Sequence, residues 1–240
     1  AMRFDLHVHT ALSACAEIIM SPAQVVRRAA AAGLDMIAIT DHNASGHVRP
    51  ALKAAAGLGI RVIPGMEVSS REEVHMLALF PGEAALADLQ ALVDAALPSD
   101  PNVPEIFGRQ VIFDEHDEVI DVDPRLRQVG TSLSLERLVL EIHERKGFAV
   151  PAHVFRARHS MLSQLGVVDA GPGFDLLEIG YAQWVRENYR LGRRCAGLPA
   201  ITGSDAHYLE CVGRVANDLP GAPCDIAGLV RKLKLMKAEP

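Results

Sequence analysis

Short, continuous apolar runs alternate with helical patterns along most of the chain, and this alternation limits the folds open to it. Runs without polar alternation are typical of strands that are buried on both faces. We predict strands at residues 3–8, 36–40, 61–68, 74–80, 148–152, 176–179 and 200–203. Helical patterns separate most of these runs, so the strands are expected to lie parallel. Seven strands favour a closed or nearly closed α/β barrel over a small open sheet.

The predicted helices have recognisable ends. Ser21 is a good N-cap because Pro22 follows at the first helical position and Gln24 at the third, and Gly33 is a typical stop. The other helices are predicted over residues 50–56, 83–96, 135–146, 183–194 and 225–237. We expect one domain that spans residues 1–240.

Residues 98–133 interrupt the alternation with a stretch rich in proline and charge. Within it, the apolar segments 111–113 and 119–120 flank the acidic residues 114–118, a pattern that predicts a β-hairpin. An insertion of this length in a barrel usually belongs to a loop beside the active site. We therefore predict a hairpin-containing insertion near the active-site face.

Composition and charge exclude several classes of protein. The net charge is −6 with no basic run, so no long nucleic-acid duplex is expected as a partner. The chain has no apolar run long enough for a membrane span and no signal-peptide pattern at its start. The four cysteines are too scattered for a disulfide framework, and we predict free thiols in a reducing cytoplasm: Cys15, Cys195, Cys211 and Cys224.

Histidines and carboxylates gather at the ends of the predicted strands. His7 and His9 end the first strand, His42 follows the second, and Glu67 ends the third. Further along the chain, His153 follows the fifth strand, and Asp205 and His207 follow the seventh. The carboxyl ends of parallel strands converge on one face, where such barrels carry their active sites. His75 fits less well, because it lies at the start of the fourth strand.

These residue types indicate a metal centre. Imidazole and carboxylate suit zinc, iron or manganese. In His7-Val8-His9 the two imidazoles lie on the same side of an extended segment, and Glu67 can bridge two ions. Taken singly, each signal has a structural explanation: Asp41 and Asp205 can cap helices, and His153 can be a hydrogen-bonded structural histidine. The remaining histidines are predicted on the surface, although His47 or His159 can also reach the mouth of the site: His47, His116, His143 and His159.

The motifs, taken together and in order, resemble the PHP (polymerase and histidinol phosphatase) family of metal-dependent phosphoesterases. They are the segments 5–10 (DLHVHT), 40–43 (TDHN), 65–67 (GME), His75, 151–153 (PAH) and 203–207 (GSDAH). The resemblance implies a distorted (β/α)7 barrel with two or three divalent ions at its C-terminal face. It implies a first ion on His7, His9, Glu67 and Asp205, a second on Glu67, His75 and His153, and a third served by His42 and His207.

The sequence departs from the family pattern at the third metal site. The family often places a histidine or aspartate shortly after the HxHT segment, whereas residues 13–17 here read SACAE. Ala14 has no ligand atom. Cys15 and Glu17 are both competent ligands, and Cys15 can equally be a small buried apolar residue.

We predict hydrolysis of a small phosphate ester or nucleotide by a hydroxide that bridges two ions. Arg156, three residues after His153, is a candidate phosphate ligand because its guanidinium can pair with two phosphate oxygens, and Arg158 is a second candidate. His207 or His42 can act as a general acid where it binds no metal, with Asp41 orienting a neighbour.

Three other functions stay open. The same centre can hydrolyse amides or lactones, it can trim nucleic-acid ends as an exonuclease, or it can serve a non-catalytic metal-binding module. Nothing in the sequence identifies the substrate, the metal or the oligomeric state. The ligand set is larger than a closed structural site needs, which favours an enzyme.

Overall fold

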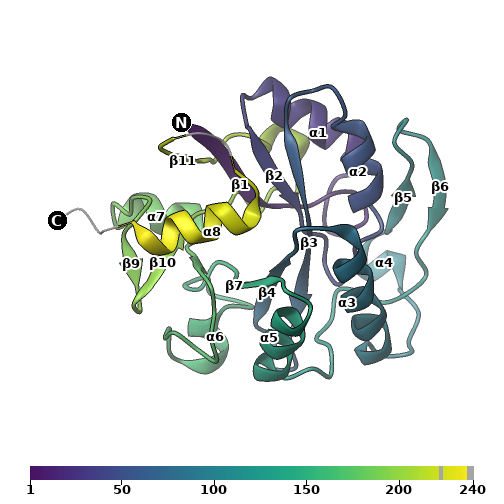
Figure 1. Cartoon of the computed structure of the whole chain (residues 1–240). Helices are drawn as coiled ribbons and strands as arrows, with labels where there is room; N and C mark the ends of the chain where they lie inside the picture. The colour runs from purple at the N-terminus through teal and green to yellow at the C-terminus, as the bar shows by residue number, and fades with distance from the viewer. Residues whose placement is uncertain (222–223, 237–240) are drawn as a thin grey trace.

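The structure is a computed structural model that describes residues 1–221 and 224–236 of the chain (Figure 1). Its strands are β1 (Met2–Val8), β2 (Met36–Ile39), β3 (Arg61–Ser69), β4 (His75–Leu79), β5 (Val111–Phe113), β6 (Val119–Val122), β7 (Phe148–Pro151), β8 (Leu177–Glu178), β9 (Arg194–Cys195), β10 (Leu198–Ile201) and β11 (Asn217–Leu219). Its helices are α1 (Pro22–Ala31), α2 (Val48–Ala54), α3 (Glu83–Ala96), α4 (Pro104–Phe107), α5 (Leu135–Glu144), α6 (Met161–Leu165), α7 (Tyr181–Arg186), the 3-10 helix η1 (Leu209–Cys211) and α8 (Ile226–Leu235).

Helix ends that depend on local capping agree with the sequence. Ser21 caps α1 by accepting a hydrogen bond from the Gln24 amide, and α3 has the predicted bounds. Helix α7 is much shorter than predicted, because Asn188 adopts a left-handed conformation with φ of 51° just after it. The predicted end of the last helix, at residue 237, lies outside the described residues.

The prediction of an all-parallel sheet is wrong at β4. The six-stranded sheet has the order β11-β1-β2-β3-β4-β7, and β4 is antiparallel to both β3 and β7. A parallel connection needs a crossover of about a dozen residues or more. Residues 70–74 between β3 and β4 are too few for one, so the chain turns back as a hairpin. Strand β11, at the other edge, is also antiparallel to its neighbour β1.

The strands form a curled sheet. Strand β8 pairs in parallel with β10 in a second sheet. Two backbone hydrogen bonds, each from a residue flanking one strand to the other strand, connect the β8 and β7 segments: Asp175 N to Ala149 O and Val154 N to Glu178 O, both 2.9 Å. A parallel bridge between Val8 and Ala206 connects β1 to the segment after β10. The fold is therefore α/β with a curled sheet, and residues far apart in the chain meet along its edge.

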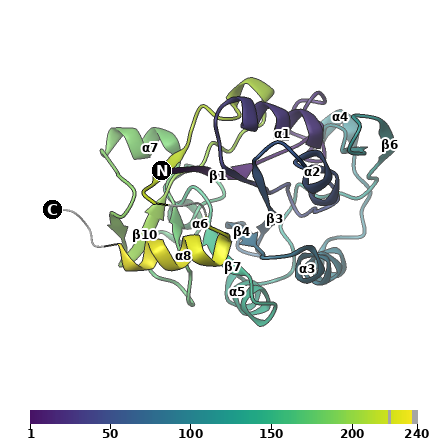
Figure 2. The same cartoon turned by 45° about the horizontal axis from the view of Figure 1, so that its top comes forward.

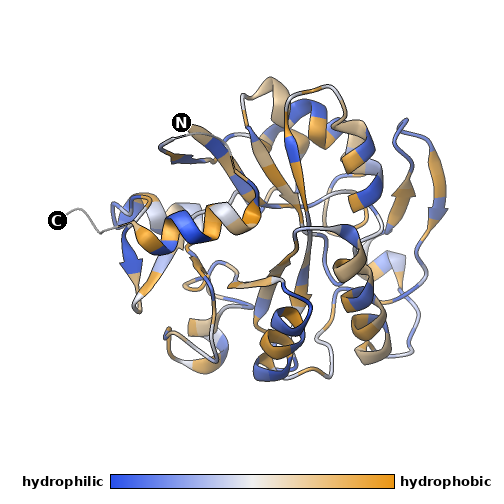
Figure 3. Ribbon diagram, in the orientation of Figure 1, coloured by the Kyte–Doolittle hydropathy of each residue, from blue (hydrophilic) through white to orange (hydrophobic). Residues whose placement is uncertain are grey.

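Side chains alternate along the strands between two apolar clusters. In β4, Met76 and Ala78 belong to one cluster, which also contains residues of α1, α3 and α5. Leu77 and Leu79 belong to the other, which is covered by α8 through Leu229 and its neighbours. Figure 2 shows these helices arranged around the central strands. Figure 3 shows that both the strands and the helices carry apolar residues. Each fully buried leucine contributes about 1.5–3 kcal/mol to folding.

Residues 98–133 contain the predicted hairpin, with β5 antiparallel to β6. Figure 1 shows it at the edge of the molecule beside α2 and α4. Among the described residues, no helix is both long and apolar enough to span a bilayer.

Candidate metal centre

Eight polar side chains converge where β1, β2, β3 and β7 end and where β10 gives way to the following loop. The antiparallel direction of β4 explains why His75 belongs to this group. His75 pairs with Ser69 at the carboxyl end of β3, so the start of β4 lies at the same edge as the ends of its neighbours. The converging residues are His7, His9, His42, Glu67, His75, His153, Asp205 and His207.

The Glu67 carboxylate lies at the centre of the group and is fully buried. Its oxygens are 2.9 Å from Nδ1 of His42 and His75, and 3.3 Å from Nε2 of His7, His9 and His153. Burial alone would raise the pKa of Glu67, but the charges of His75, His7 and His42 outweigh it and hold that pKa well below its usual value. Glu67 is therefore ionised and faces histidines on several sides.

Three overlapping sets of ligand atoms are each compact enough for one ion, with all atoms of a set within 4.8 Å of one another. They are His7, His9, Glu67 and Asp205; His42, Glu67 and His75; and His9, His42 and His207. The first set equals the one implied by the family resemblance. The second contains His42 where the resemblance implies His153, although His153 Nε2 also faces Glu67. Nitrogen and carboxylate donors in these numbers fit zinc, iron or manganese.

Protons compete with cations for these atoms. Burial lowers the pKa of His7, yet Glu178, Glu67 and Asp205 together raise it well above its usual value. Burial likewise works against protonation of His42, but Glu67 and Cys15 raise its pKa to about 10. The pKa of Asp205 is well below its usual value despite burial, because His7 and His9 face it. Histidines must lose their protons to bind a metal, so ion binding at this centre would release protons.

Glu178 belongs to the site and was missed from the sequence. Both of its carboxylate oxygens lie 3.0 Å from His7 Nδ1, which directs Nε2 of that ring toward Glu67. A Cβ atom at Gly203 would lie 2.5 Å from Glu178 Oε2 and 2.8 Å from His7 Cβ, so only glycine fits there. Glu178 is the second-last residue of its predicted strand, as Glu67 is of its own, and that position was the available signal.

Two of the converging residues have strained backbones. His153 has φ of 32° and Asp205 has φ of 48°, in the left-handed region that non-glycine residues rarely adopt. Such strain costs of the order of 1–3 kcal/mol and is found preferentially at functional sites. The fold therefore pays a small stability cost to place these two side chains.

Asp41 lies behind the ligand group rather than in it. It is fully buried, and its Oδ1 accepts hydrogen bonds from the Thr10 amide and the Ser13 hydroxyl, both 2.7 Å long. Ser13 Oγ is in turn 2.9 Å from His9 Nδ1. Asp41 thus contacts the site through Ser13.

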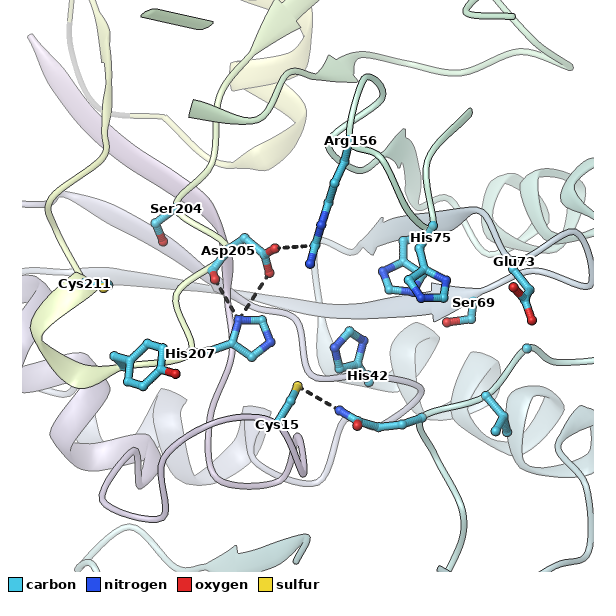
Figure 4. Close-up of a pocket in the computed structure, with 15 residues that line it drawn as sticks. Cys15, His42, Ser69, Glu73, His75, Arg156, Ser204, Asp205, His207 and Cys211 are labelled. Atoms are coloured by element: carbon cyan, nitrogen blue, oxygen red, sulfur yellow. Dashed lines mark hydrogen bonds and ion pairs between the residues drawn. The ribbon is translucent and has the colours of Figure 1, made fainter. Parts of the chain in front are cut away.

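The two candidates for the third metal site, Cys15 and Glu17, have different surroundings. Cys15 lines the main cavity, and its Sγ accepts a hydrogen bond of 2.8 Å from Gln128 Nε2 (Figure 4). Burial raises the pKa of Cys15, but hydrogen bonds with His207 and His42 lower it to about 5. Glu17 is exposed, and its carboxylate accepts a hydrogen bond from the Leu209 amide. Of the two, the structure brings only Cys15 to the histidines.

A cavity of about 590 Å³ opens over the group. Arg156 lines it, and its Nη1 is 2.9 Å from Asp205 Oδ2 (Figure 4). Arg158 is exposed and is not among the cavity-lining residues that the structure describes. Residues 128–130 of the insertion also line this cavity.

The prediction of a surface position is wrong for His47, whereas His159 lies at the mouth of the site, the alternative that the sequence left open. His47 is fully buried: Nδ1 is 2.7 Å from Thr10 Oγ1, and Nε2 accepts a hydrogen bond of 2.8 Å from the Phe113 amide. His159 lines the cavity and stacks on His75, with ring centroids 4.7 Å apart. His143 is partly exposed and pairs with Asp175. His47 is buried against the distant hairpin, and no residue pattern near His47 indicates this contact.

Burial of His47 predicts a pH-dependent stability. Burial lowers the pKa of His47 from its usual 6.5 to about 4. Between these values the unfolded chain binds a proton that the folded chain does not, so stability falls as pH drops from about 6.5 to about 4, by up to about 3 kcal/mol. Urea unfolding of metal-free protein should show this fall, and His47→Gln should lack that part of it. Equal pH profiles for both proteins would contradict the assignment.

Comparison with known proteins gives two family matches. A family model described as "PHP domain" matches residues 5–164, which is more than half of the chain. A second, described as "PHP-associated", matches residues 193–237. The two matched segments together contain all eight of the converging residues.

Individual relatives match smaller parts or only the fold. A 3′,5′-nucleoside bisphosphate phosphatase from Chromobacterium violaceum is 41% identical over 88 residues, which cover 35% of this chain and 30% of that protein. The solved structure of an amidohydrolase from the same organism, with bound sulfate and no metal, has a TM-score of 0.60 and 25% identity over 96% of both chains. Endonuclease Q in complex with a 27-mer duplex has a TM-score of 0.68 over 99% of this chain and 57% of that one; its 16% identity shows the fold alone.

Proposed function

Because the chain belongs to the PHP domain family, we propose that it is a metal-dependent phosphoesterase that hydrolyses a small phosphate ester or a nucleotide. The observation that carries this proposal is the position of Glu67, which belongs to two of the compact sets of ligand atoms and has histidine nitrogens near both of its oxygens. A carboxylate in that position can bridge two ions. Bound ions would acidify a water molecule and neutralise charge on the phosphoryl oxygens.

The proposed ligands build on the three sets of atoms, with His153 added to the second set and Cys15 in place of His9 in the third. His7, His9, Glu67 and Asp205 would hold a first ion, and Glu67 with His75, His153 and His42 would hold a second. For a third ion we assign His42, His207 and Cys15. We leave out Glu17 because its side chain is exposed and its carboxylate accepts a hydrogen bond from the Leu209 amide. His207 Nδ1 lies 2.8 Å from the carbonyl oxygen of Asp205, which leaves Nε2 free for an ion. Where no third ion binds, His42 or His207 can protonate the leaving group.

We also propose the finer description of the fold as a distorted (β/α)7 barrel in a single domain over residues 1–240. The hydrogen bonds between β7 and β8 and the Val8–Ala206 bridge support it. The insertion 98–133 is assigned to the active-site face because residues 128–130 line the main cavity.

Arg156 is assigned to the substrate phosphate, and Arg158 serves as its matched control. Loss of a charge-assisted hydrogen bond costs about 1.5–3 kcal/mol. Arg156→Gln should therefore raise KM for a phosphate ester about tenfold to 100-fold, while Arg158→Gln leaves KM unchanged. Steady-state kinetics on both variants checks this. Equal effects of the two substitutions would remove Arg156 from the assignment.

The proposed function is tested by metal analysis together with a substrate panel. Purified protein, loaded in turn with zinc, manganese or ferrous iron, should hold two or three ions per chain and release phosphate from p-nitrophenyl phosphate or a nucleotide. The panel also contains a 5′-phosphorylated oligonucleotide, a cyclic amide and a lactone. Shortening of the oligonucleotide would favour an exonuclease, and turnover of the carbonyl substrates alone would favour an amide or lactone hydrolase. A chain that binds metal without turning over any substrate would favour a non-catalytic module.

A further inference from the structure

The ligand His9 is connected to Asp41 by a buried chain of two hydrogen bonds that the proposed function does not use. His9 Nδ1 lies 2.9 Å from Ser13 Oγ, and Ser13 Oγ lies 2.7 Å from Asp41 Oδ1. The three side chains are 0–1% exposed, so water does not compete for these bonds. Ser13 Oγ also accepts a hydrogen bond of 3.1 Å from the His42 amide.

The direction of each hydrogen bond follows from counting protons. The Ser13 hydroxyl donates its single proton to Asp41 Oδ1. The Ser13 oxygen then has only acceptor capacity left, which the His42 amide and His9 Nδ1–H fill. His9 must therefore carry a proton on Nδ1, and its Nε2 faces Glu67 and Asp205, at 3.3 and 3.1 Å.

The opposite side of Asp41 is fixed in the same way. Thr10 donates its hydroxyl proton to Asp41 Oδ2 at 2.6 Å, and the Thr10 amide donates to Oδ1 at 2.7 Å. Because its own proton is used, Thr10 Oγ1 accepts from His47 Nδ1–H, and His47 Nε2 accepts from the Phe113 amide of the hairpin. Asp41 is thus held by donors on both oxygens and cannot turn away from Ser13.

We propose that Asp41 and Ser13 are positioning residues that fix the proton of His9 on Nδ1 and so keep Nε2 free for a metal ion. The proposal rests on the proposed function only in taking His9 as a metal ligand. Residues behind a metal-binding histidine typically change metal affinity 10–100-fold when they are replaced. A catalytic base at Asp41 would instead act through its negative charge.

Two substitutions at Asp41 separate these roles. Asp41→Ala removes the acceptor, so Ser13 can turn and donate to His9 Nδ1, which moves the His9 proton to Nε2. Asp41→Asn removes the charge but keeps one oxygen. That oxygen must take the Oδ1 position, because an amide NH₂ there would face the Thr10 N–H at 2.7 Å. Ser13 then keeps its acceptor and His9 keeps its proton on Nδ1.

The experiment measures zinc affinity by competition with a chelating dye and, in metal-free protein at high pH, the protonation of the two His9 ring nitrogens by ¹⁵N NMR. We expect about 10–100-fold weaker zinc binding and a proton on Nε2 in Asp41→Ala. Asp41→Asn should retain near-wild-type affinity and a proton on Nδ1. Ser13→Ala should weaken zinc binding as Asp41→Ala does, with folding of all variants checked by circular dichroism.

The outcomes are distinct. Equal losses of zinc affinity in Asp41→Asn and Asp41→Ala would overturn the proposal in favour of a role for the charge. Wild-type affinity in both Asp41→Ala and Ser13→Ala would overturn it as well. A wild-type protein that binds no zinc would instead contradict the proposed function, and the NMR comparison would still report whether Asp41 fixes the His9 proton.

Discussion

Replacing Glu67 with glutamine should remove bound metal and lower kcat/KM for a phosphate ester by at least about 1000-fold, the equivalent of about 4 kcal/mol. The amide has the same shape, but it has one oxygen instead of two and no charge. It cannot bridge two ions, and its NH₂ group faces histidine nitrogens at the position of one carboxylate oxygen. Metal content per chain, measured by elemental analysis, and steady-state kinetics together check the result.

Glu141→Gln is the matched control for Glu67→Gln. Glu141 is also a buried glutamate, but it lies on α5 and pairs with Arg137 and Arg145. The control should keep its metal and its kcat/KM, whatever it loses in stability. If Glu67→Gln kept full metal content and wild-type kcat/KM, Glu67 would not be the bridging residue and the proposed centre would have to be redrawn.

Chelation of the ions should lower the melting temperature by about 10 °C. An ion present at 1000 times its Kd stabilises the folded state by about 4 kcal/mol, and 1 kcal/mol corresponds to about 2–4 °C for a chain of this size. Differential scanning calorimetry before and after dialysis against a chelator measures the shift.

Readdition of zinc should restore both the melting temperature and the phosphatase activity. Glu67→Gln serves as the control, because a protein that binds no ion should melt at the same temperature with and without chelator. A wild-type melting curve that chelation leaves unchanged would show that the ions contribute no stability, and the ligand group would then need another explanation.

Local chemistry made part of this structure predictable. The Ser21 cap, the bounds of α3 and the hairpin at 111–122 depend on neighbouring residues, and the sequence carries those signals directly. The convergence of His7, Glu67 and Asp205 was predictable for a different reason: each ends or follows a strand, and strand ends meet on one face of such folds.

Other features depend on contacts between distant segments. The antiparallel direction of β4 follows from the shortness of the 70–74 connection, which has five residues. The sequence contains this signal, but the prediction relied on the general alternation of strands and helices instead. The burial of His47 depends on the Phe113 amide, 66 residues away, and nothing near His47 indicates it. The choice between Cys15 and Glu17 required the path of the loop, because both residue types can bind metal.

The β3–β4 hairpin has a consequence for how the ligand group assembles during folding. Glu67 and His75 are eight residues apart and meet when one short hairpin closes, a local event with a small loop-closure entropy. His9 and Asp205 are separated by 196 residues and meet only when the two ends of the domain come together. One half of the centre can thus form early and offer two ligands to an ion, whereas the other half completes the coordination only in the finished fold.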